Sequence, residues 1–500
     1  MVATIDFINS LIWSKALIAL CLGVGLYFSV RTRFMQVRGF GEMIRLMFSG
    51  QKSESGVSSF QALAMSLSGR VGIGNIAGVA TAITFGGPGA VFWMWTVAFL
   101  GASTAYVEST LAQIYKEKDP QGQYRGGPAY YIEKAMGQKW YAVTFAIATV
   151  LATGVLLPGV QANGIAVSVQ NAWGVPTSVT AVLIVIALGT IIFGGVKRIA
   201  AFAQVVVPFM ALAYILTALV IMFMNIGQAP EIFALIFRSA FGAEAAFGAV
   251  LGLAVEWGVK RGVYSNEAGQ GTGPHAAAAA EVSHPAKQGY VQAFSVYVDT
   301  LLVCSATAFM ILSTGKYNVN HPDGSMIVNS LPGMETGPGY TQAAVESVLP
   351  GFGASFVALA IMFFAFTTIV AYYYMAETNV QYINRAVHRG WMTLVLKFAI
   401  MASVTYGAIR SAGVAWALGD IGVGLMAWLN IIAILILQKP ALIALKDYEA
   451  QKKAGKDPTF DPEKLGIRNA DLWKDRKTAQ AAATRESPGA PTAEAGDYLD

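Results

Sequence analysis

Two short stretches carry polar and helix-weakening residues inside long apolar segments of the chain. The first reads SGRVGIGN, from Ser68 to Asn75, and the second reads SNEAGQGTGP, from Ser265 to Pro274. Each stretch holds three glycines, and the second also holds a proline and the acidic residue Glu267. Because glycine and proline weaken a helix, each stretch predicts a helix that is interrupted part-way along its length.

The chemistry of such an interruption comes from its backbone. In lipid, unwound peptide groups must line a cavity or contact a ligand, because lipid cannot satisfy their hydrogen bonds. The amino-terminal ends of half-helices favour a carboxylate, and freed carbonyl groups favour a small hard cation such as Na⁺. One glycine-rich stretch also fits close packing between helices. Two such stretches favour a site for a small zwitterion together with a cation.

Further polar residues lie within apolar segments and are candidates for the same site. Thr367 and Thr368 are adjacent, so either their two hydroxyls bind one ion or each hydroxyl bonds a carbonyl of its own helix. Glu267 is either a ligand for an ammonium group or a cation, or the partner of Arg261 in an ion pair.

Other charged residues in apolar segments are expected to have partners, because intramembrane charges are costly. Lys260 and Arg261 precede the second stretch. We expect them to line an outer vestibule and to form a gate with Asp420. We expect Asp299 to bond the nearby unwound backbone.

Membrane-spanning helices must position these residues. The chain has 500 residues, of which 55% are hydrophobic and 13% are charged, whereas soluble domains carry roughly 25% charged residues. Apolar runs long enough to cross a bilayer lie at residues 11–30, 58–84, 88–115, 139–170, 176–194, 199–225, 240–275, 286–313, 343–380, 391–409 and 412–437. The composition therefore predicts an all-α polytopic membrane protein with about 11 spans. The fourth, seventh and ninth runs are too long for a straight crossing, so we expect each to contain either a break or an interfacial turn.

The two interrupted runs occupy equivalent places in the order of spans. They are the second and the seventh, so they begin two units of five spans that cross the membrane in opposite directions. Paired broken helices of this kind form a site at the middle of the membrane. We therefore divide the chain into an extra amino-terminal helix with its loop (1–57), two five-helix repeats (58–225 and 226–437) and a polar tail (438–500).

Loop charge predicts the orientation of the chain. Lysine and arginine gather in the loops after the odd-numbered spans, and such loops are usually cytoplasmic. We therefore expect the amino terminus outside and the tail in the cytoplasm. The end of the tail, RESPGAPTAEAGDYLD, has few apolar residues and is expected to be disordered. The long outside loop 314–340 is either a lid over a vestibule or a connector.

Several classes of protein are excluded or disfavoured. The net charge is +5, but the basic residues cluster beside apolar spans, which argues against nucleic-acid binding. Cys21 and Cys304 lie in apolar runs and are expected to be buried thiols. The four histidines are scattered and show no metal-ligand spacing. Because no nucleophile–base pair or metal cluster is recognisable, we expect a transporter that needs no cofactor other than a coupling ion, and not an enzyme.

The longest motifs resemble those of a known family. The segments GRVGIGNIAGVATAITFGGPGAVFWMW, GVKRGVYSNEAGQGTGPHAAAAA and HPAKQGYVQAFSVYVDTLLVCSATAF resemble the alanine/glycine:cation symporters, also called sodium:alanine symporters. The resemblance implies a leucine-transporter-like fold, with two inverted five-helix repeats and one extra amino-terminal helix. It also implies Na⁺-driven uptake of alanine, glycine or a similar small neutral amino acid across a bacterial or archaeal plasma membrane. H⁺ is the alternative coupling ion.

The resemblance also implies roles for individual residues. Thr367 and Thr368 fall where this fold places two hydroxyl ligands of a sodium site, and the other ligands are expected to be backbone carbonyls near Ser68 and Val71. Ile73 stands where a small hydroxyl residue is expected in many relatives, which would change the fit of the pocket. The residues expected to bind the substrate are Gly72, Gly74, Asn75, Ser265, Asn266, Glu267, Ala268 and Gly269.

Overall fold

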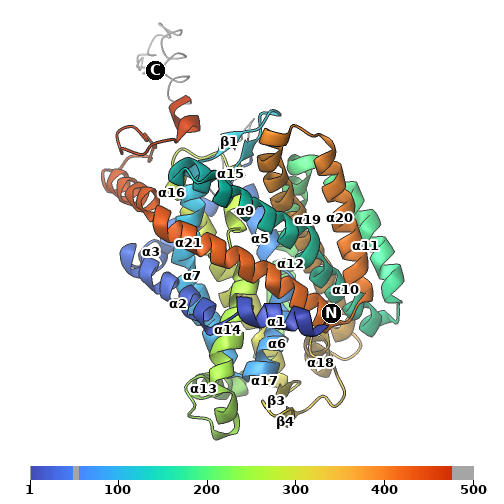
Figure 1. Ribbon diagram of the computed structural model, residues 1–500. Helices are drawn as coiled ribbons and strands as arrows, with labels where there is room; N and C mark the ends of the chain where they lie inside the picture. Colours follow the sequence, from blue (N-terminus) through green and yellow to red (C-terminus); the bar gives the residue numbers. More distant parts are fainter. Residues whose placement is uncertain (1, 49–55, 476–500) are drawn as a thin grey trace, which may run out of the picture.

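The computed structural model of the protein describes residues 2–48 and 56–475 and consists almost entirely of helices (Figure 1). The helices from the amino terminus to residue 224 are α1 (Val2–Ile12), α2 (Lys15–Arg31), α3 (Met35–Arg38), α4 (Phe40–Met47), α5 (Ser59–Arg70), α6 (Ala77–Gly86), α7 (Gly89–Ile114), α8 (Pro128–Tyr131), α9 (Lys139–Leu151), α10 (Leu157–Trp173), α11 (Thr177–Ile192) and α12 (Gly195–Met224). The later helices are α13 (Ala229–Ala240), α14 (Leu251–Asn266), α15 (Gly273–Ala279), α16 (Pro285–Val296), α17 (Ser305–Thr314), α18 (Pro338–Val348), α19 (Gly353–Val387), α20 (Trp391–Ile409) and α21 (Ala412–Lys453).

Short elements connect or interrupt these helices. The 3₁₀ turns are η1 (Ile73–Asn75), η4 (Ile226–Gln228) and η5 (Ala245–Val250). The π-helical stretches are η2 (Ile132–Met136), η3 (Ala152–Leu156) and η6 (Tyr297–Cys304). Two antiparallel hairpins are formed by β1 (Glu117–Lys118) with β2 (Tyr124–Arg125) and by β3 (Asn318–Asn320) with β4 (Met326–Asn329).

The helices confirm an all-α polytopic membrane protein. Within residues 2–48 and 56–475, eight helices are long and apolar enough to cross a membrane. The shorter apolar helices include α6 and α11. The predicted runs 58–84 and 240–275 are each divided into shorter helices, so neither is one continuous span. The number of eleven spans therefore stays a prediction.

Each of the three runs that seemed too long for a straight crossing contains an irregularity. The fourth run has the π-helical stretch η3 between α9 and α10, the seventh is divided into α14 and α15, and the ninth is divided into α18 and α19. π-Helical turns and helix breaks are frequent at functional sites. The seventh and ninth runs are therefore broken as predicted, whereas the fourth is one continuous helix with a π-helical stretch in it.

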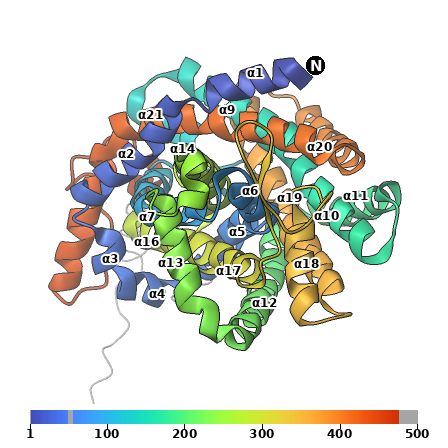
Figure 2. The same ribbon diagram turned by 90° about the horizontal axis from the view of Figure 1, so that it is seen from below.

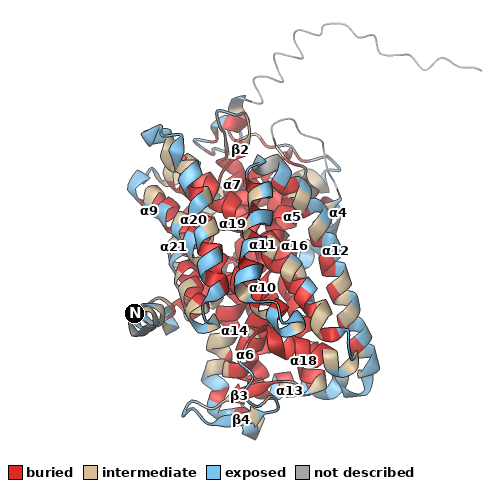
Figure 3. Cartoon of the chain, turned by 90° about the vertical axis from the view of Figure 1, so that its right-hand side faces the viewer, coloured by how far each residue is buried: buried red, intermediate tan, exposed pale blue. Residues whose placement is uncertain are grey.

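The outer surface of the bundle is apolar where lipid is expected to surround it. Residues on the outward sides of α11 and α12, including Leu183, Ile186 and Phe209, have well over half of their surface exposed. The interior is closely packed and buried, as Figure 3 shows by colour. Large exposed apolar areas of this kind indicate contact with a membrane.

The two ends of the bundle differ in character. One end, here called the hairpin face, carries β3, β4, α13 and α18 (Figure 1). The opposite end, here called the basic face, carries β1 and the carboxyl-terminal segment (Figure 1). The predicted cytoplasmic loops lie at the basic face, although the orientation of the chain in a membrane stays a prediction.

The carboxyl-terminal part is more ordered than predicted. Helix α21 continues to Lys453, so the boundary placed at residue 438 falls inside one helix. Residues 454–475 then pack on the basic face, where the Phe460 amide donates to the Ser283 carbonyl over 3.1 Å and the Trp473 indole donates to the Gln113 carbonyl over 2.9 Å. The stretch 485–500, which we expected to be disordered, lies outside the described residues.

At the other end of the chain, α1 lies across α21 (Figures 1 and 2).

Candidate functional site

The first glycine-rich stretch interrupts a helix as predicted. Helix α5 begins with a reciprocal cap, in which the Gln61 amide donates to Ser58 Oγ over 3.2 Å and the Ser58 amide donates to Gln61 Oε1 over 3.0 Å. The helix ends at Arg70, and the backbone leaves the helical region at Val71 and Gly72. The 3₁₀ turn η1 and helix α6 then continue the crossing.

Two backbone N–H groups freed by this interruption are held by side-chain oxygens. The Gly72 N–H donates to Asn75 Oδ1 over 2.8 Å, and the Ile73 N–H donates to Gln161 Oε1 over 3.0 Å. Gln161 lies in α10 and is buried. The unwound backbone therefore presents adjacent donors to oxygen acceptors, which is the arrangement that a carboxylate requires.

The second stretch is also unwound. Helix α14 ends at Asn266, and α15 begins at Gly273. Between them Glu267, Gly269 and Gly271 have positive φ angles of 57°, 81° and 87°. Glycine adopts this conformation freely, whereas a non-glycine residue such as Glu267 is found there infrequently and then usually where function or packing requires it.

The two interruptions meet each other. A Cβ atom added to Gly74 would lie 3.3 Å from the Cα of Ser265, so the two backbones are in close contact. The carboxylate of Asp299, in the π-helical stretch η6, joins them: its Oδ1 accepts from Asn75 Nδ2 over 2.6 Å and from Ser265 Oγ over 3.2 Å. We expected Asp299 to bond the unwound backbone. It bonds side chains from both interruptions instead, and Cys304 Sγ lies beside the same two side chains.

The second interruption has its own polar support from α7 and α21. Asn430 Nδ2 donates to the Gly269 carbonyl over 3.0 Å and to Glu108 Oε2 over 2.7 Å. Glu108 Oε1 accepts from the Gly269 N–H over 3.2 Å, and Tyr131 donates to Asn430 Oδ1. Both hydrogen-bonding groups of the Gly269 backbone are thereby satisfied although the segment is unwound.

Glu267 faces the first interruption and has an unused acceptor. Its Oε2 lies 3.3 Å from the position of a Cβ atom on Gly69 and accepts from Thr272 Oγ1 over 2.9 Å. Its Oε1 is buried without a hydrogen-bond partner among the described residues. The alternative in which Arg261 pairs with Glu267 is not supported, because Arg261 pairs with Asp420. A role for Glu267 as a ligand stays a prediction.

Lys260, Arg261 and Asp420 come together as predicted. Asp420 Oδ2 lies 2.9 Å from Lys260 Nζ and 2.6 Å from Arg261 Nη2, and all three side chains are largely buried. The Arg261 guanidinium also lies 4.5 Å from the ring centre of Trp416. The cluster joins α14 to α21. Its action as a gate stays a prediction.

The two adjacent threonines differ in their surroundings. Thr368 Oγ1 lies 3.4 Å from the Val71 carbonyl and 3.0 Å from the Phe364 carbonyl. Thr367 Oγ1 donates to the same Phe364 carbonyl over 2.9 Å, and it lies 4.0 Å from Met210 Sδ of α12. Each hydroxyl therefore bonds a carbonyl of its own helix. This was the alternative to the binding of one ion by both hydroxyls. Thr368 alone also reaches the first interruption.

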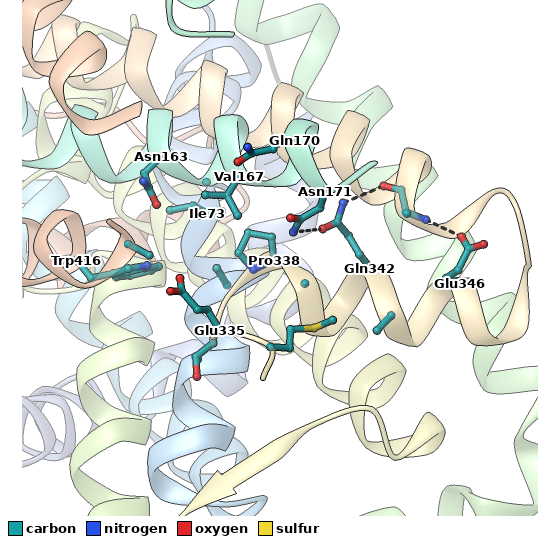
Figure 4. Close-up of a pocket in the computed structure, with 18 of the residues that line it drawn as sticks. Ile73, Asn163, Val167, Gln170, Asn171, Glu335, Pro338, Gln342, Glu346 and Trp416 are labelled. Atoms are coloured by element: carbon teal, nitrogen blue, oxygen red, sulfur yellow. Dashed lines mark hydrogen bonds between the residues drawn. The ribbon is translucent and has the colours of Figure 1, made fainter. Parts of the chain in front are cut away.

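A cavity of about 620 Å³ leads from the hairpin face to the first interruption (Figure 4). Ile73, Ala77 and Trp416 are among the residues that line it. Glu335, from the loop between β4 and α18, lines the cavity as well. The loop 314–340 thus supplies part of the wall and is more than a connector.

Comparison of the whole sequence with models of known families identifies the family of the chain. A sequence model of the sodium:alanine symporter family matches residues 1–462. The chain belongs to the sodium:alanine symporter family.

Relatives of this symporter-family chain cover almost its full length. It is 63% identical over 479 residues to YrbD of Bacillus subtilis (strain 168). That alignment covers 95% of this chain and 99% of YrbD. It is 56% identical over 433 residues to the sodium/proton-dependent alanine carrier protein of Bacillus sp. (strain PS3), over 86% of this chain and 97% of that protein. A crystal structure of the manganese transporter of Eremococcus coleocola is similar with a TM-score of 0.47 and 13% identity, over 87% of this chain and 88% of that chain.

Membership in the sodium:alanine symporter family confirms the resemblance seen in the motifs. The chain is a membrane transporter and not an enzyme. The order of elements, with one interrupted helix at the start of each five-span unit, agrees with the leucine-transporter-like fold. Where exactly the repeats begin and end stays a prediction.

Some residues of the site were not predicted. Gln161 and Asn430 are polar residues within predicted apolar spans. A polar residue that stands alone in an apolar span often has a functional role, so both could have been found from the sequence. Trp416 gave no comparable signal, because aromatic residues are common in apolar spans. Cys304 and Cys21 were expected to be buried thiols, and both are buried and free.

Proposed function

We propose that the chain is a Na⁺-coupled symporter that takes up alanine, glycine or a similarly small neutral amino acid. The observation that carries the proposal is the contact between the two unwound segments, where Gly74 meets Ser265. The neighbouring residue Ile73 lines the cavity described above. The name of the Bacillus sp. (strain PS3) relative, a sodium/proton-dependent alanine carrier, supports both the substrate and the choice of coupling ions.

The amino acid is proposed to bind between the two interruptions. Its carboxylate would take the place of the side-chain oxygens that now accept from the Gly72 and Ile73 N–H groups. Its ammonium group would face the acidic and polar side chains of the second interruption, where Glu267 Oε1 lacks a partner. The Ile73 side chain packs against Gly164 and leaves room only for a small substrate side chain.

The sodium ion is proposed to lie between the first interruption and α19. The Val71 carbonyl and Thr368 Oγ1, 3.4 Å apart, supply two of the oxygens that Na⁺ prefers. Ser68 would contribute its carbonyl oxygen. Thr367 would join only if its hydroxyl turned away from Phe364, to which it now donates. Because Na⁺ would hold Val71 in place, it would stabilise the same backbone that binds the substrate carboxylate.

We propose a direction of access from the different character of the two ends of the bundle. The cavity opens at the hairpin face, which we propose is outside. On the basic face, which we propose is cytoplasmic, polar contacts close the path: Arg125 Nη1 lies 3.4 Å from Glu377 Oε2, and Asn379 Nδ2 lies 2.7 Å from His275 Nε2. Uptake requires these contacts to open while the outer cavity closes, as in alternating access.

Uptake of labelled alanine and glycine into proteoliposomes tests the proposal. A Na⁺ gradient should drive accumulation of alanine above its outside concentration, and an ionophore that dissipates the gradient should abolish it. The second candidate is an H⁺-coupled permease, which the name of the same relative also supports. Accumulation that follows an imposed pH gradient and ignores Na⁺ would replace the first candidate with the second.

A further inference from the structure

A second concave site lies at the membrane edge of the basic face, between the end of α2 and the last turns of α21. We call it the basic groove. Its volume is about 590 Å³, and the charged residues that line it are Arg31, Arg33, Arg38, Lys446, Glu449 and Lys453. The groove therefore gathers five cations around one carboxylate.

Most of this positive charge is not neutralised by the protein. Glu449 is paired with Arg38, whose Nη2 lies 2.8 Å from the carboxylate. Within residues 2–48 and 56–475, Arg31, Arg33, Lys446 and Lys453 form no ion pair. Cations that share one concave surface attract an anion more strongly than isolated surface cations do, because their potentials add.

The shape of the groove depends on a turn that is costly to form. Arg33 and Phe34 are consecutive non-glycine residues with positive φ angles of 56° and 53°, a conformation that such residues adopt infrequently. Arg38 holds the turn, because its Nε donates to the Arg33 carbonyl over 2.7 Å and its Nη2 donates to the Thr32 carbonyl over 3.0 Å. Arg38 is thereby committed to the structure, whereas the four remaining cations are available to a ligand.

The groove is continuous with an apolar surface. On α2, Leu26 and Val30 are 51% and 57% exposed, and on α21, Ile436 is 62% exposed. Helices α2 and α21 lie side by side (Figure 2), and Tyr27 donates to Gln438 between them over 2.9 Å. A ligand with a phosphate at one end and hydrocarbon chains at the other matches a cationic groove next to an apolar helix face.

We infer that the basic groove binds the headgroup of an anionic phospholipid, with the phosphate between Arg31, Arg33, Lys446 and Lys453 and the acyl chains along α2 and α21. Its location at the end of a membrane-spanning helix places the groove at headgroup depth. A zwitterionic lipid gains less from the same contacts, because its own cation is repelled by the groove. The inference is independent of the substrate and of the coupling ion.

The experiment uses the purified full-length protein in detergent. Its thermal midpoint is measured while phosphatidylglycerol, phosphatidylcholine with the same acyl chains, or inorganic phosphate is added. Phosphatidylglycerol should raise the midpoint at lower concentrations than phosphatidylcholine, and inorganic phosphate should have no effect. An equal response to both lipids would overturn the inference, and so would a stabilisation by phosphate that equals that of phosphatidylglycerol.

Variants locate the effect in the groove. Arg33→Gln combined with Lys446→Gln removes two exposed cations. It should raise the phosphatidylglycerol concentration for half-maximal stabilisation about 25-fold, at about fivefold for each cation. Lys139→Gln combined with Arg389→Gln removes two exposed cations of the same face outside the groove and should leave that concentration unchanged. Equal shifts in the two variants would show that general surface charge is responsible and would overturn the inference.

A second measurement does not depend on stability. Native mass spectrometry of the wild-type protein in mixed lipid should show phosphatidylglycerol retained in preference to phosphatidylcholine. The groove variant should lose this preference, and the control variant should keep it. Retention by the groove variant at the wild-type level would contradict the inference.

Discussion

Gly72 is the position at which a single methyl group should disturb the proposed sodium site. A Cβ atom at Gly72 would lie 2.5 Å from Thr368 Oγ1 and 2.9 Å from Gln161 Oε1, well inside ordinary van der Waals contact. The backbone itself tolerates alanine, because the φ angle of Gly72 is −138°. The Gly72→Ala variant should therefore fold but displace the Thr368 hydroxyl or the Gln161 amide.

The magnitude follows from the cost of the added methyl group. Overpacking of a close-packed site costs about 1–3 kcal/mol, which corresponds to about 5-fold to 150-fold in affinity. The assay is Na⁺-dependent alanine uptake in proteoliposomes. The concentration of Na⁺ or of alanine that gives half-maximal uptake should rise by a factor in this range.

The matched control lies six residues further along the same crossing. A Cβ atom at Gly78, in α6, would lie 3.7 Å from Trp416 Cη2 and 3.9 Å from Arg261 Cδ, which is ordinary contact. Gly78→Ala should leave uptake unchanged. Wild-type Na⁺ and alanine dependence in Gly72→Ala would refute the placement of the site at the first interruption.

Further predictions concern single side chains. Thr368→Val should raise the Na⁺ concentration for half-maximal uptake about tenfold, since a bond to a charged group contributes about 1.5–3 kcal/mol. Thr367→Val should raise that concentration less. Equal effects of the two variants would contradict the difference in the surroundings of the two threonines. Asp299→Asn should lower uptake about tenfold in protein that elutes normally by size exclusion, and undiminished uptake would remove Asp299 from the site. Asp420→Asn should lower the unfolding free energy by about 3–5 kcal/mol because it leaves two buried cations without a carboxylate; an unchanged thermal midpoint would disprove this. Trp473→Ala should make residues 454–475 cleavable by limited proteolysis, whereas wild-type resistance would show that the indole contact is dispensable.

The positions of the two helix interruptions were predictable because their causes are local. Glycine spacing in each stretch weakens the helix wherever the stretch is placed, and Glu267 marks the second one. The order of spans then indicated that the two interruptions are equivalent. The contact between Gly74 and Ser265 follows from that equivalence, since paired broken helices cross near the middle of the membrane.

The partners of the interrupted segments were less predictable, because they come from distant parts of the chain. Gln161 is 88 residues from Ile73, to whose N–H it binds, and no local pattern connects the two. The expectation that Thr367 and Thr368 bind the same ion failed to be supported for a different reason. Neighbouring residues on a helix point about 100° apart, so adjacency in sequence does not bring both hydroxyls to one surface.

Equilibrium binding of labelled alanine to the purified protein tests the central claim most directly, since binding requires no gradient and no conformational cycle. Measured in Na⁺ and in choline at equal ionic strength, the affinity for alanine should be at least tenfold higher in Na⁺, because the ion and the carboxylate stabilise the same unwound backbone. In Gly72→Ala this difference should shrink or disappear. Alanine binding that is equally tight in choline, in both proteins, would contradict the proposed coupling at the first interruption.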